Sequence, residues 1–275
     1  MAELVRQVNL KRMPVNRKLI GWVFVVTGLV SGWLWWREQK PQLEPLKISY
    51  QIERKEEEEK PVARIRSRLN SAQGDWAVAV YRLDEKKGYG VNEETVLPAA
   101  SIMKVPIMMA VFRKIEAGSL KLEDVEEDLR ATGKRSDNDA PATLVQMVGR
   151  DFVKQTIAQL EMAHTDFDAN TTTAYDVVMM WRKIYEEKNQ QLLDLLQDSI
   201  YEDRIPPGLP VGISFVHKVG TDLDIWSDAG IVMAEKPFVL VIMNEKVDMD
   251  EAKKLVPELT ALIWDYEAGR NAKPQ

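Results

Sequence analysis

The chain has 275 residues, of which 45% are hydrophobic and 29% are charged, so it can bury the core of a globular domain. Its net charge of -6 argues against the clustered basic surface that nucleic-acid binding would need. The absence of cysteine excludes disulfides, thiolate metal ligands, lipidated cysteine and a cysteine nucleophile. The two histidines, His164 and His217, have no ligand spacing, so we predict no metal site and no cofactor.

Residues 19–36, LIGWVFVVTGLVSGWLWW, are an uncharged run near the lower limit of length for crossing a bilayer. Tryptophans stand at both ends of this run, as at the two interfaces of a membrane span. Residues 1–18 carry five lysines or arginines against Glu3, so the positive-inside rule makes them a cytoplasmic basic tail. We therefore predict a single-pass protein of the cell membrane whose remaining chain is extracytoplasmic.

A cleaved signal peptide is the alternative interpretation of the apolar run. It would need small residues at a cleavage site just past the apolar core, where this chain has WLWWREQK. An uncleaved anchor is therefore favoured. Residues 37–61 follow with Pro41, Pro45 and the run ERKEEEEK, which predicts a charged linker, or alternatively a short solvated helix.

Residues 62–275 are predicted to form one domain with strands near both ends and helices between. Strands are predicted at 76–83 with a partner strand after the turn KKGYGVN, and at 212–220, 225–234 and 237–244. Helices are predicted at 122–130, 139–148, 151–160, 173–197 and 251–269. This order predicts an α+β fold, in which an antiparallel sheet of about five strands joins both ends of the domain and packs against helices.

The stretch PAASIMKVPIMMAVFRKIEAG, residues 98–118, places Ser101 and Lys104 three apart at the start of an apolar helix. This spacing puts both side chains on one helix face, and the residues after them predict a helix buried on all sides. Because burial disfavours the charge of a lysine, Lys104 could act as a base toward the Ser101 hydroxyl. A chance match is the alternative, with Ser101 as a helix cap and Lys104 reaching solvent.

Two further short motifs follow along the chain. SDN at 136–138 precedes Pro141 and an apolar run, so it is predicted to lie in a loop, and a helix cap is its alternative interpretation. KVG at 218–220 lies on a predicted strand, where an exposed lysine is the alternative. His217 should point to the opposite face of that strand from Lys218.

In this order, SIMK at 101–104, SDN and KVG resemble the motif set of active-site serine penicillin-recognising enzymes, and of the class A β-lactamase group in particular. The longer stretches PAASIMKVPIMMAVFRKIEAGSLKLEDV, TTTAYDV and RIPPGLPVGISFVHKVG are also similar to that family. The resemblance covers roughly residues 70–267. It implies a β-lactamase-like fold, and the short interval between the first two motifs suggests a reduced all-helical subdomain.

The resemblance implies a division of roles among four side chains. Ser101 would attack the carbonyl of a β-lactam or a D-Ala-type cell-wall peptide and form an acyl-enzyme, while Lys104 holds or takes its proton. Ser136 would relay a proton to the leaving nitrogen. Lys218 would supply a positive charge that attracts a substrate carboxylate.

Further residues complete the implied site. Asn138 would present its amide to the substrate or to Lys104, and Gly220 would leave room for substrate along the strand. The backbone N–H groups of Ser101 and Thr221 would form the oxyanion hole. Arg204 is either a second carboxylate anchor or a surface salt-bridge residue, and we predict the latter.

Two departures from the family pattern limit the predicted activity. Val219 stands where the family has Thr or Ser, which removes a hydroxyl that would hydrogen-bond the substrate carboxylate. The loop before TTTAYDV has no clearly aligned glutamate to activate the deacylating water, because Glu161 lies too early in the sequence. Asp166 or Asp168 could substitute, although the ordinary interpretation of both is that they keep the loop soluble. We therefore predict intact acylation and slow deacylation.

Two other functions remain open at this point. The first is a D,D-peptidase or penicillin-binding enzyme that acts on cell-wall peptides. The second is a catalytically idle domain that binds cell-wall fragments or a partner protein.

Overall fold

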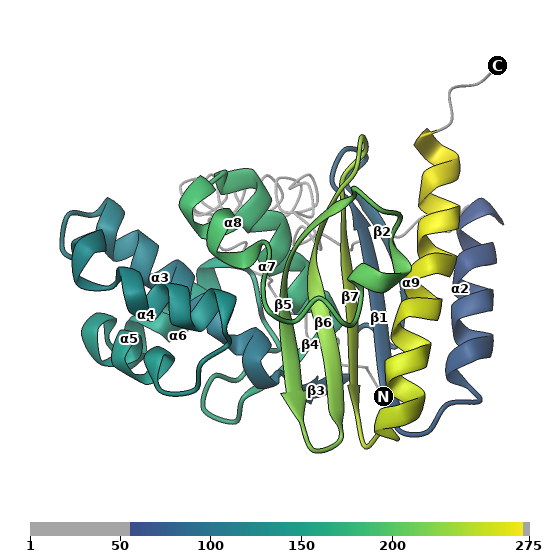
Figure 1. Cartoon of the computed structure of the whole chain (residues 1–275), viewed down its shortest axis with the longest axis horizontal. Helices are drawn as coiled ribbons and strands as arrows, with labels where there is room; N and C mark the ends of the chain where they lie inside the picture. Colours follow the sequence, from purple (N-terminus) through teal and green to yellow (C-terminus); the bar gives the residue numbers. More distant parts are fainter. Residues whose placement is uncertain (1–55, 272–275) are drawn as a thin grey trace, which may run out of the picture. The chain divides into compact units, whose positions relative to one another are not determined.

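The computed structural model describes residues 56–271 (Figure 1). The predicted cytoplasmic tail, the predicted anchor and most of the predicted linker lie outside the described residues. Within the described part, no helix combines the length and the apolar character needed to cross a membrane.

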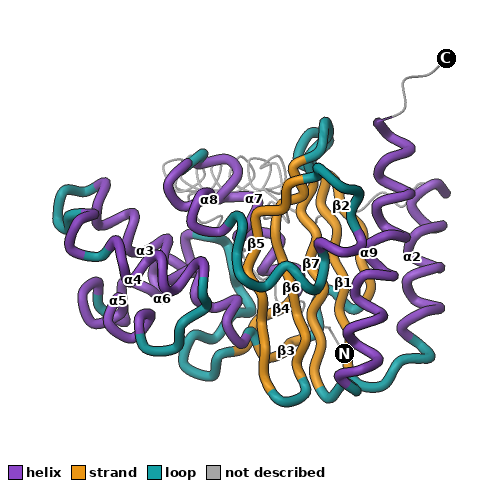
Figure 2. Tube along the Cα trace, in the orientation of Figure 1, coloured by secondary structure: helices purple, strands orange, loops and turns teal. Residues whose placement is uncertain are grey.

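A five-stranded antiparallel sheet lies at the centre of the described unit, in the order β2-β1-β7-β6-β5 (Figure 2). Its strands are β1 (Asp75–Arg82), β2 (Lys87–Val91), β5 (Ser214–Asp222), β6 (Ile225–Met233) and β7 (Phe238–Glu245). β7, near the C-terminus, pairs with β1 along its whole length, from Asp75↔Glu245 to Arg82↔Phe238. The predicted antiparallel sheet that joins both ends of the domain is confirmed.

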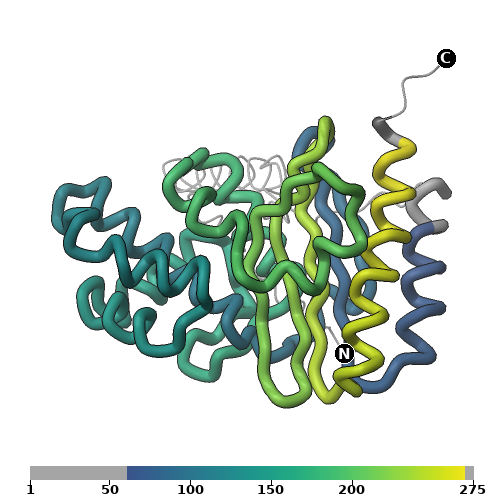
Figure 3. The backbone as a smooth tube through the Cα atoms, in the orientation of Figure 1, coloured from purple at the N-terminus to yellow at the C-terminus, as the bar shows by residue number. Residues whose placement is uncertain are grey.

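Both faces of the sheet are covered by helices. Helices α2 (Glu56–Leu69) and α9 (Met249–Asn271) lie side by side on one face (Figure 3), and α7 (Ala174–Glu187) packs on the other. Because β7 is covered on both faces, its sequence FVLVIM is a continuous apolar run and not an alternating one, and all six residues are buried.

The folded domain begins earlier than predicted. α2 starts at Glu56, inside the predicted linker, and Val62, Ile65 and Leu69 join the hydrophobic core between the sheet and α9. These residues are spaced by three and four, so they lie on one face of the helix.

The helical part of the domain lies beyond β5, the edge strand (Figure 1). It contains the 3-10 turn η1 (Ala100–Met103) and the helices α3 (Lys104–Glu116), α4 (Glu126–Lys134), α5 (Ala140–Val148), α6 (Arg150–Gln159) and α8 (Gln190–Leu196). Two short strands, β3 (Val96–Pro98) and β4 (Thr171–Thr173), pair with each other at its base.

The prediction of a single helix over 173–197 was wrong. α7 ends where Lys188 adopts a left-handed backbone conformation with φ of 52°. Asn189 then caps α8, because its side-chain oxygen accepts a hydrogen bond from the N–H of Leu192 at 3.0 Å. The apolar periodicity continues across this break, which is why the sequence pattern did not reveal it.

Candidate active site

Ser101 lies in η1, directly before α3. The preceding residue, Ala100, has φ of 45°, a conformation that residues with a Cβ atom rarely adopt. The turn is held in place by a hydrogen bond from the N–H of Ala99 to the carbonyl of Asn170 at 2.9 Å. The half-buried Ser101 therefore sits on a short, constrained turn.

Lys104 is buried at the first position of α3, with 8% of its surface exposed. The prediction of a helix buried on all sides is confirmed over its first half, since every residue from Lys104 to Phe112 is buried. The Lys104 Nζ donates to the carbonyl of Ser136 at 2.6 Å, to the Ser136 Oγ at 3.4 Å and to the Asn138 Oδ1 at 3.0 Å. The fold thus brings the first two motifs into direct contact.

The surroundings of Lys104 disfavour its charge. Burial lowers the pKa of Lys104 to about 8, and the nearby carboxylate of Asp137 opposes this effect only in part. At neutral pH the Lys104 amine therefore gives up its proton more readily than a surface lysine would.

The SDN loop performs two tasks at once. Asp137 Oδ1 accepts the N–H groups of Ala140 at 2.9 Å and Asp139 at 2.8 Å, so this residue caps the start of α5, as in the alternative interpretation of the motif. These backbone bonds also lower the pKa of Asp137. The residues on either side, Ser136 and Asn138, turn toward Lys104, and Ser136 adopts φ of 53°.

Lys218 is buried on β5, with 2% of its surface exposed. Its burial, and then the positive charge of Lys104, lower the pKa of Lys218 to about 7. The positive charge of Lys104 therefore acts on Lys218, and contacts between β5 and η1 bring the first and third motifs close together. No side chain or carbonyl in residues 56–271 accepts a hydrogen bond from the Lys218 Nζ, so this buried cation has capacity for an anion.

The end of β5 faces the turn that carries Ser101. A side chain at Gly220 would lie 3.1 Å from the carbonyl oxygen of Ala99, so only glycine fits without displacing this turn. The register partner of Thr221 is Trp226, which donates its N–H to the Asn244 side chain. Thr221 and Trp226 therefore form a non-hydrogen-bonded antiparallel pair, in which the two backbone N–H groups point away from each other. The Thr221 N–H thus points to the open edge of β5.

Arg204 is not a surface residue, and that prediction was wrong. Only 1% of its surface is exposed, and its Nη1 donates to the carbonyls of Gly220 at 2.8 Å and Ser227 at 2.7 Å. Its Nη2 donates to the Thr221 Oγ1 at 2.6 Å, and its guanidinium lies 3.9 Å from the ring centroid of Trp226. Arg204 therefore clamps β5 to β6; the sequence offered no periodic signal for its burial, because it lies in a loop.

Glu161 points toward α7 and is engaged by two cations. Its Oε2 lies 2.5 Å from Arg182 Nη2, and its Oε1 lies 2.9 Å from Lys183 Nζ. These partners, Lys183 first, lower the pKa of Glu161 and favour its charged form. A carboxylate held in this way is a poor base toward a water molecule.

The two other candidate carboxylates in this loop are also occupied. Asp166 Oδ1 accepts the N–H groups of Asp168 at 2.8 Å and Ala169 at 3.0 Å. Asp168 forms ion pairs with Lys154 and Arg150, which lower its pKa. Asp166 and Asp168 therefore shape the loop and attach it to α6.

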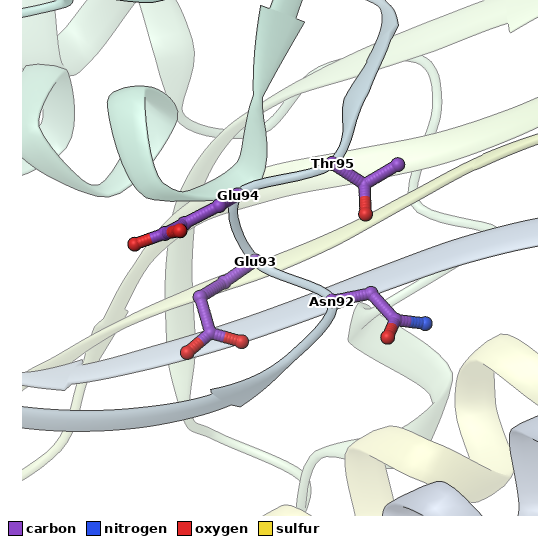
Figure 4. Close-up of a pocket in the computed structure, with 4 residues that line it drawn as sticks. All are labelled: Asn92, Glu93, Glu94 and Thr95. Atoms are coloured by element: carbon purple, nitrogen blue, oxygen red, sulfur yellow. The ribbon is translucent and has the colours of Figure 1, made fainter.

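The turn between β2 and β3 lines a separate hollow (Figure 4). In this view the side chains of Glu93 and Glu94 point to one side, and those of Asn92 and Thr95 to the other. The turn is fixed by hydrogen bonds from the Thr95 N–H to the Asn92 carbonyl and from the Asn92 side chain to the carbonyl of Trp76, both at 2.9 Å. None of the predicted site residues lines this hollow.

Comparison with known proteins identifies the family and the fold. Residues 60–127 and 124–267 match the model of the Beta-lactamase enzyme family. Beta-lactamase VEB-1 of Pseudomonas aeruginosa is 22% identical, and the match covers 69% of this chain and 84% of that protein. The solved structure of PBP-A has a TM-score of 0.70 at 20% identity, covering 78% of this chain and 97% of PBP-A.

A beta-lactamase from Sphaerobacter thermophilus gives a TM-score of 0.69, also at 20% identity, and covers 78% of this chain and 99% of that one. These similarities establish the fold, and the family match extends over most of the domain. The chain belongs to the beta-lactamase enzyme family and is a serine hydrolase of the class A-like type.

Proposed function

We propose that this protein forms an acyl-enzyme on Ser101 with β-lactams or D-Ala-type peptides and releases the acyl group slowly. The observation that carries the proposal is the buried amine of Lys104, hydrogen-bonded to Ser136 and Asn138 beside the turn of Ser101. A lysine placed in an apolar helix without a catalytic task would be costly to the fold. Its contacts support a role in proton transfer.

The proposed acylation proceeds as follows. Ser101 Oγ attacks the carbonyl carbon of the amide, and its proton passes to Lys104, which must then be neutral. The C–N bond breaks, and the leaving nitrogen receives a proton through the Ser136 hydroxyl, which lies 3.4 Å from the Lys104 amine. The N–H groups of Ser101 and Thr221 stabilise the negative charge that develops on the carbonyl oxygen.

Lys218 is proposed to bind the substrate carboxylate. It is a buried cation with a lowered pKa, and a bound carboxylate would stabilise its charged form. The same charge would lower the cost of proton transfer through Ser136. Val219 contributes no hydroxyl here, so the carboxylate would rely on Lys218 to a greater extent.

Slow release follows from the carboxylates of the loop at 161–168. Glu161, Asp166 and Asp168 are each held by cations or by backbone N–H groups, so none is placed as a free base for a deacylating water. Among the structural relatives, a mutant of PBP-A has been solved as an acyl-enzyme complex with penicillin-G. We propose that an acyl-enzyme of this kind is also the long-lived state of this chain.

The test is intact mass spectrometry of the full chain in mild detergent, mixed with benzylpenicillin and followed over time. We expect an adduct of the mass of the drug that persists for many minutes and is absent from Ser101→Ala. Rapid loss of the adduct with hydrolysed drug would indicate an efficient β-lactamase. No adduct from either protein would overturn the proposal and favour a catalytically idle binding domain.

A D,D-peptidase would use the same residues with a different leaving group, so a peptide ending in D-Ala-D-Ala is the second substrate to test. Release of D-Ala, absent in Ser101→Ala, would identify the peptide activity.

The membrane anchor remains part of this proposal. Its basis is the uncharged run at 19–36 behind a basic tail, and we propose that it holds the domain on the extracytoplasmic side. Protease added to intact spheroplasts should digest the domain. In a separate sample without protease, the protein should stay in the membrane fraction after a carbonate wash. Recovery of the protein in the soluble fraction would contradict an anchor.

A further inference from the structure

The face of β5 opposite Lys218 carries a buried histidine between two carboxylates. His217 is 1% exposed, its Nδ1 lies 2.8 Å from Asp228 Oδ1, and its Nε2 lies 3.2 Å from Glu202 Oε1. A carboxylate oxygen only accepts, so both ring nitrogens must donate, and only the imidazolium form can do this. The geometry therefore describes a charged histidine inside the domain.

These two carboxylates are the titratable groups that face the ring within the described part of the chain. Asp228 comes from β6 and is fully buried, whereas the Glu202 side chain is 44% exposed. Burial alone would lower the pKa of His217, but Asp228 and then Glu202 raise it to about 9. The Phe215 ring, at 4.7 Å between centroids, closes one side of the site.

A serine near the ring suggests a Ser-His-Asp arrangement, but the contacts argue against it. Ser199 Oγ lies 3.4 Å from His217 Nε2, farther than Glu202, and it accepts the N–H of Tyr201 at 3.0 Å. An imidazolium has no lone pair with which to accept a proton from a serine. The ring is therefore an ion-pair partner and not a general base.

The ion pair attaches a segment that we call the strap, residues 199–205. Glu202 connects the middle of the strap to His217, and Ile205 at its end donates its N–H to Asp228 Oδ2 at 3.2 Å. The strap also carries Arg204, which reaches over β5 to the carbonyl of Gly220 and the hydroxyl of Thr221. Chain contacts thus run without interruption from His217 to the residue whose N–H is assigned to the oxyanion hole.

We propose that the His217 imidazolium is a positioning residue for Ser101 acylation: its ion pairs with Asp228 and Glu202 hold the strap, and the strap, through Arg204, fixes the Gly220–Thr221 end of β5. This inference rests on the proposed acyl-enzyme function. His217 itself does not contact the substrate, because it lies on the far face of β5 from Lys218. Its loss should alter the acylation step more than the initial binding of the drug.

The charge state is measured first, by nitrogen NMR of the full chain labelled at histidine. The chain has two histidines, so His164→Gln leaves His217 as the single ring signal. We expect both ring nitrogens to stay protonated through neutral pH and to lose a proton near pH 9. A neutral ring at pH 7.5 would overturn the ion pair.

The positioning role is measured on His217→Gln, with the matched control His164→Gln, whose side chain is 61% exposed. We expect His217→Gln to acylate with penicillin at least about tenfold more slowly at saturating drug, with hydrogen exchange faster at the Ile205 and Thr221 amides. The His164→Gln control should match the wild type in its acylation rate and in its amide hydrogen exchange. Wild-type acylation rates and unchanged exchange in His217→Gln would overturn the role.

Glu202→Gln keeps the inference testable if His217→Gln does not fold. It removes one carboxylate from the ring, so the His217 signal should titrate at lower pH. In a Lys218→Met background, where the fall from Lys218 is absent, the fall in the acylation rate should move to that same lower pH. A shifted ring titration with an unshifted rate would overturn the coupling. Absence of any adduct in the wild type would instead overturn the proposed function, while the NMR titration and amide exchange would still test the ion pair and the strap.

Discussion

The loop at 136–138 and the loop at 161–168 use their polar side chains in opposite ways. In the first, Ser136 and Asn138 converge on a buried amine whose pKa is lowered, so the contacts leave a group ready to move a proton. In the second, Glu161 and Asp168 are held by cations that lower their pKa values and keep them charged. One region is organised for proton transfer, and the other is organised for local structure.

This difference separates the two halves of a serine hydrolase cycle. Formation of the acyl-enzyme needs a base for the serine, and its hydrolysis needs a base for water. Residues 56–271 contain a clear candidate base for the serine, Lys104, and none for the water. Changes in the two regions should therefore have effects that differ in size and in the step they affect.

The largest effect is expected from Ser101→Ala. Removal of the Oγ atom removes the only proposed site of covalent attachment, so no adduct should form at any drug concentration. Intact mass spectrometry measures this directly, and circular dichroism checks that the variant is folded. An adduct of equal mass on the folded variant would place the nucleophile elsewhere.

Lys218→Met should lower the second-order rate constant of acylation by about 10²-fold, because the variant lacks the buried cation that is proposed to bind the substrate carboxylate and to assist proton transfer through Ser136. Methionine fills a similar volume, and loss of a buried charge should leave the domain at least as stable. The loss should be much smaller with a drug ester that lacks the carboxylate. Equal losses for the acid and the ester would contradict carboxylate binding by Lys218.

The pH dependence of acylation comes next in size. Lys104 must be neutral, which is favoured above about pH 8, and Lys218 must be charged, which is favoured below about pH 7. Because the two lysines interact, the rise and the fall of the pH–rate profile report apparent pKa values of the pair and not of either lysine alone. The acylation rate should show a narrow maximum between about pH 7 and pH 8. Lys218→Met should remove the fall above about pH 7 and leave only the fall near pH 9 that follows from deprotonation of His217. A rate that keeps rising to pH 10 in the wild type would contradict this assignment.

Val219→Thr is expected to raise the acylation rate by about three- to tenfold, since one added hydroxyl can hydrogen-bond the substrate carboxylate. Val219→Ala is the matched control, because it changes the side chain without adding a hydroxyl. Stopped-flow measurements with a chromogenic cephalosporin would resolve a change of this size. A rate for Val219→Thr no higher than that of the control would indicate that a hydroxyl at 219 has no access to substrate.

The smallest effect is expected from Glu161→Gln. Its ion pairs with Arg182 and Lys183 are partly exposed, so unfolding should become easier by less than about 1 kcal/mol. The rate of adduct loss should not change. A clear slowing of deacylation, measured by the lifetime of the penicillin adduct, would give Glu161 the role of a base and remove the contrast between the two loops.

Much of the fold was predictable because its signals are local. The apolar runs at 76–83 and 237–244 and the periodic run at 251–269 correspond to β1, β7 and α9. The break between α7 and α8 was missed because it depends on the backbone conformation of Lys188, an ordinary residue to sequence reasoning. α2 was missed because its charged beginning resembles a spacer, and only contact with α9 makes its apolar face a core.

The sequence named candidate residues for the site but not the contacts that support them. Ser101, Lys104, Ser136 and Lys218 follow from motif order, whereas the buried position of Arg204 depends on a strand pair and a tryptophan that are adjacent only after folding. The same holds for His217, whose partners Glu202 and Asp228 come from different segments. Long-range contacts of this kind leave no spacing pattern in a single sequence.

The order of strands in the sheet has a consequence for how the domain reaches its native state. β1 gains its second neighbouring strand only when β7 has been synthesised. The ion pair between Lys246 and Asp75 likewise joins residues that are 171 positions apart in the sequence. Such non-local pairing makes folding slow, and until then the β1–β2 hairpin exposes an unpaired edge that invites aggregation. A chain that stops before β7 carries every predicted catalytic side chain and lacks the strand that would assemble them.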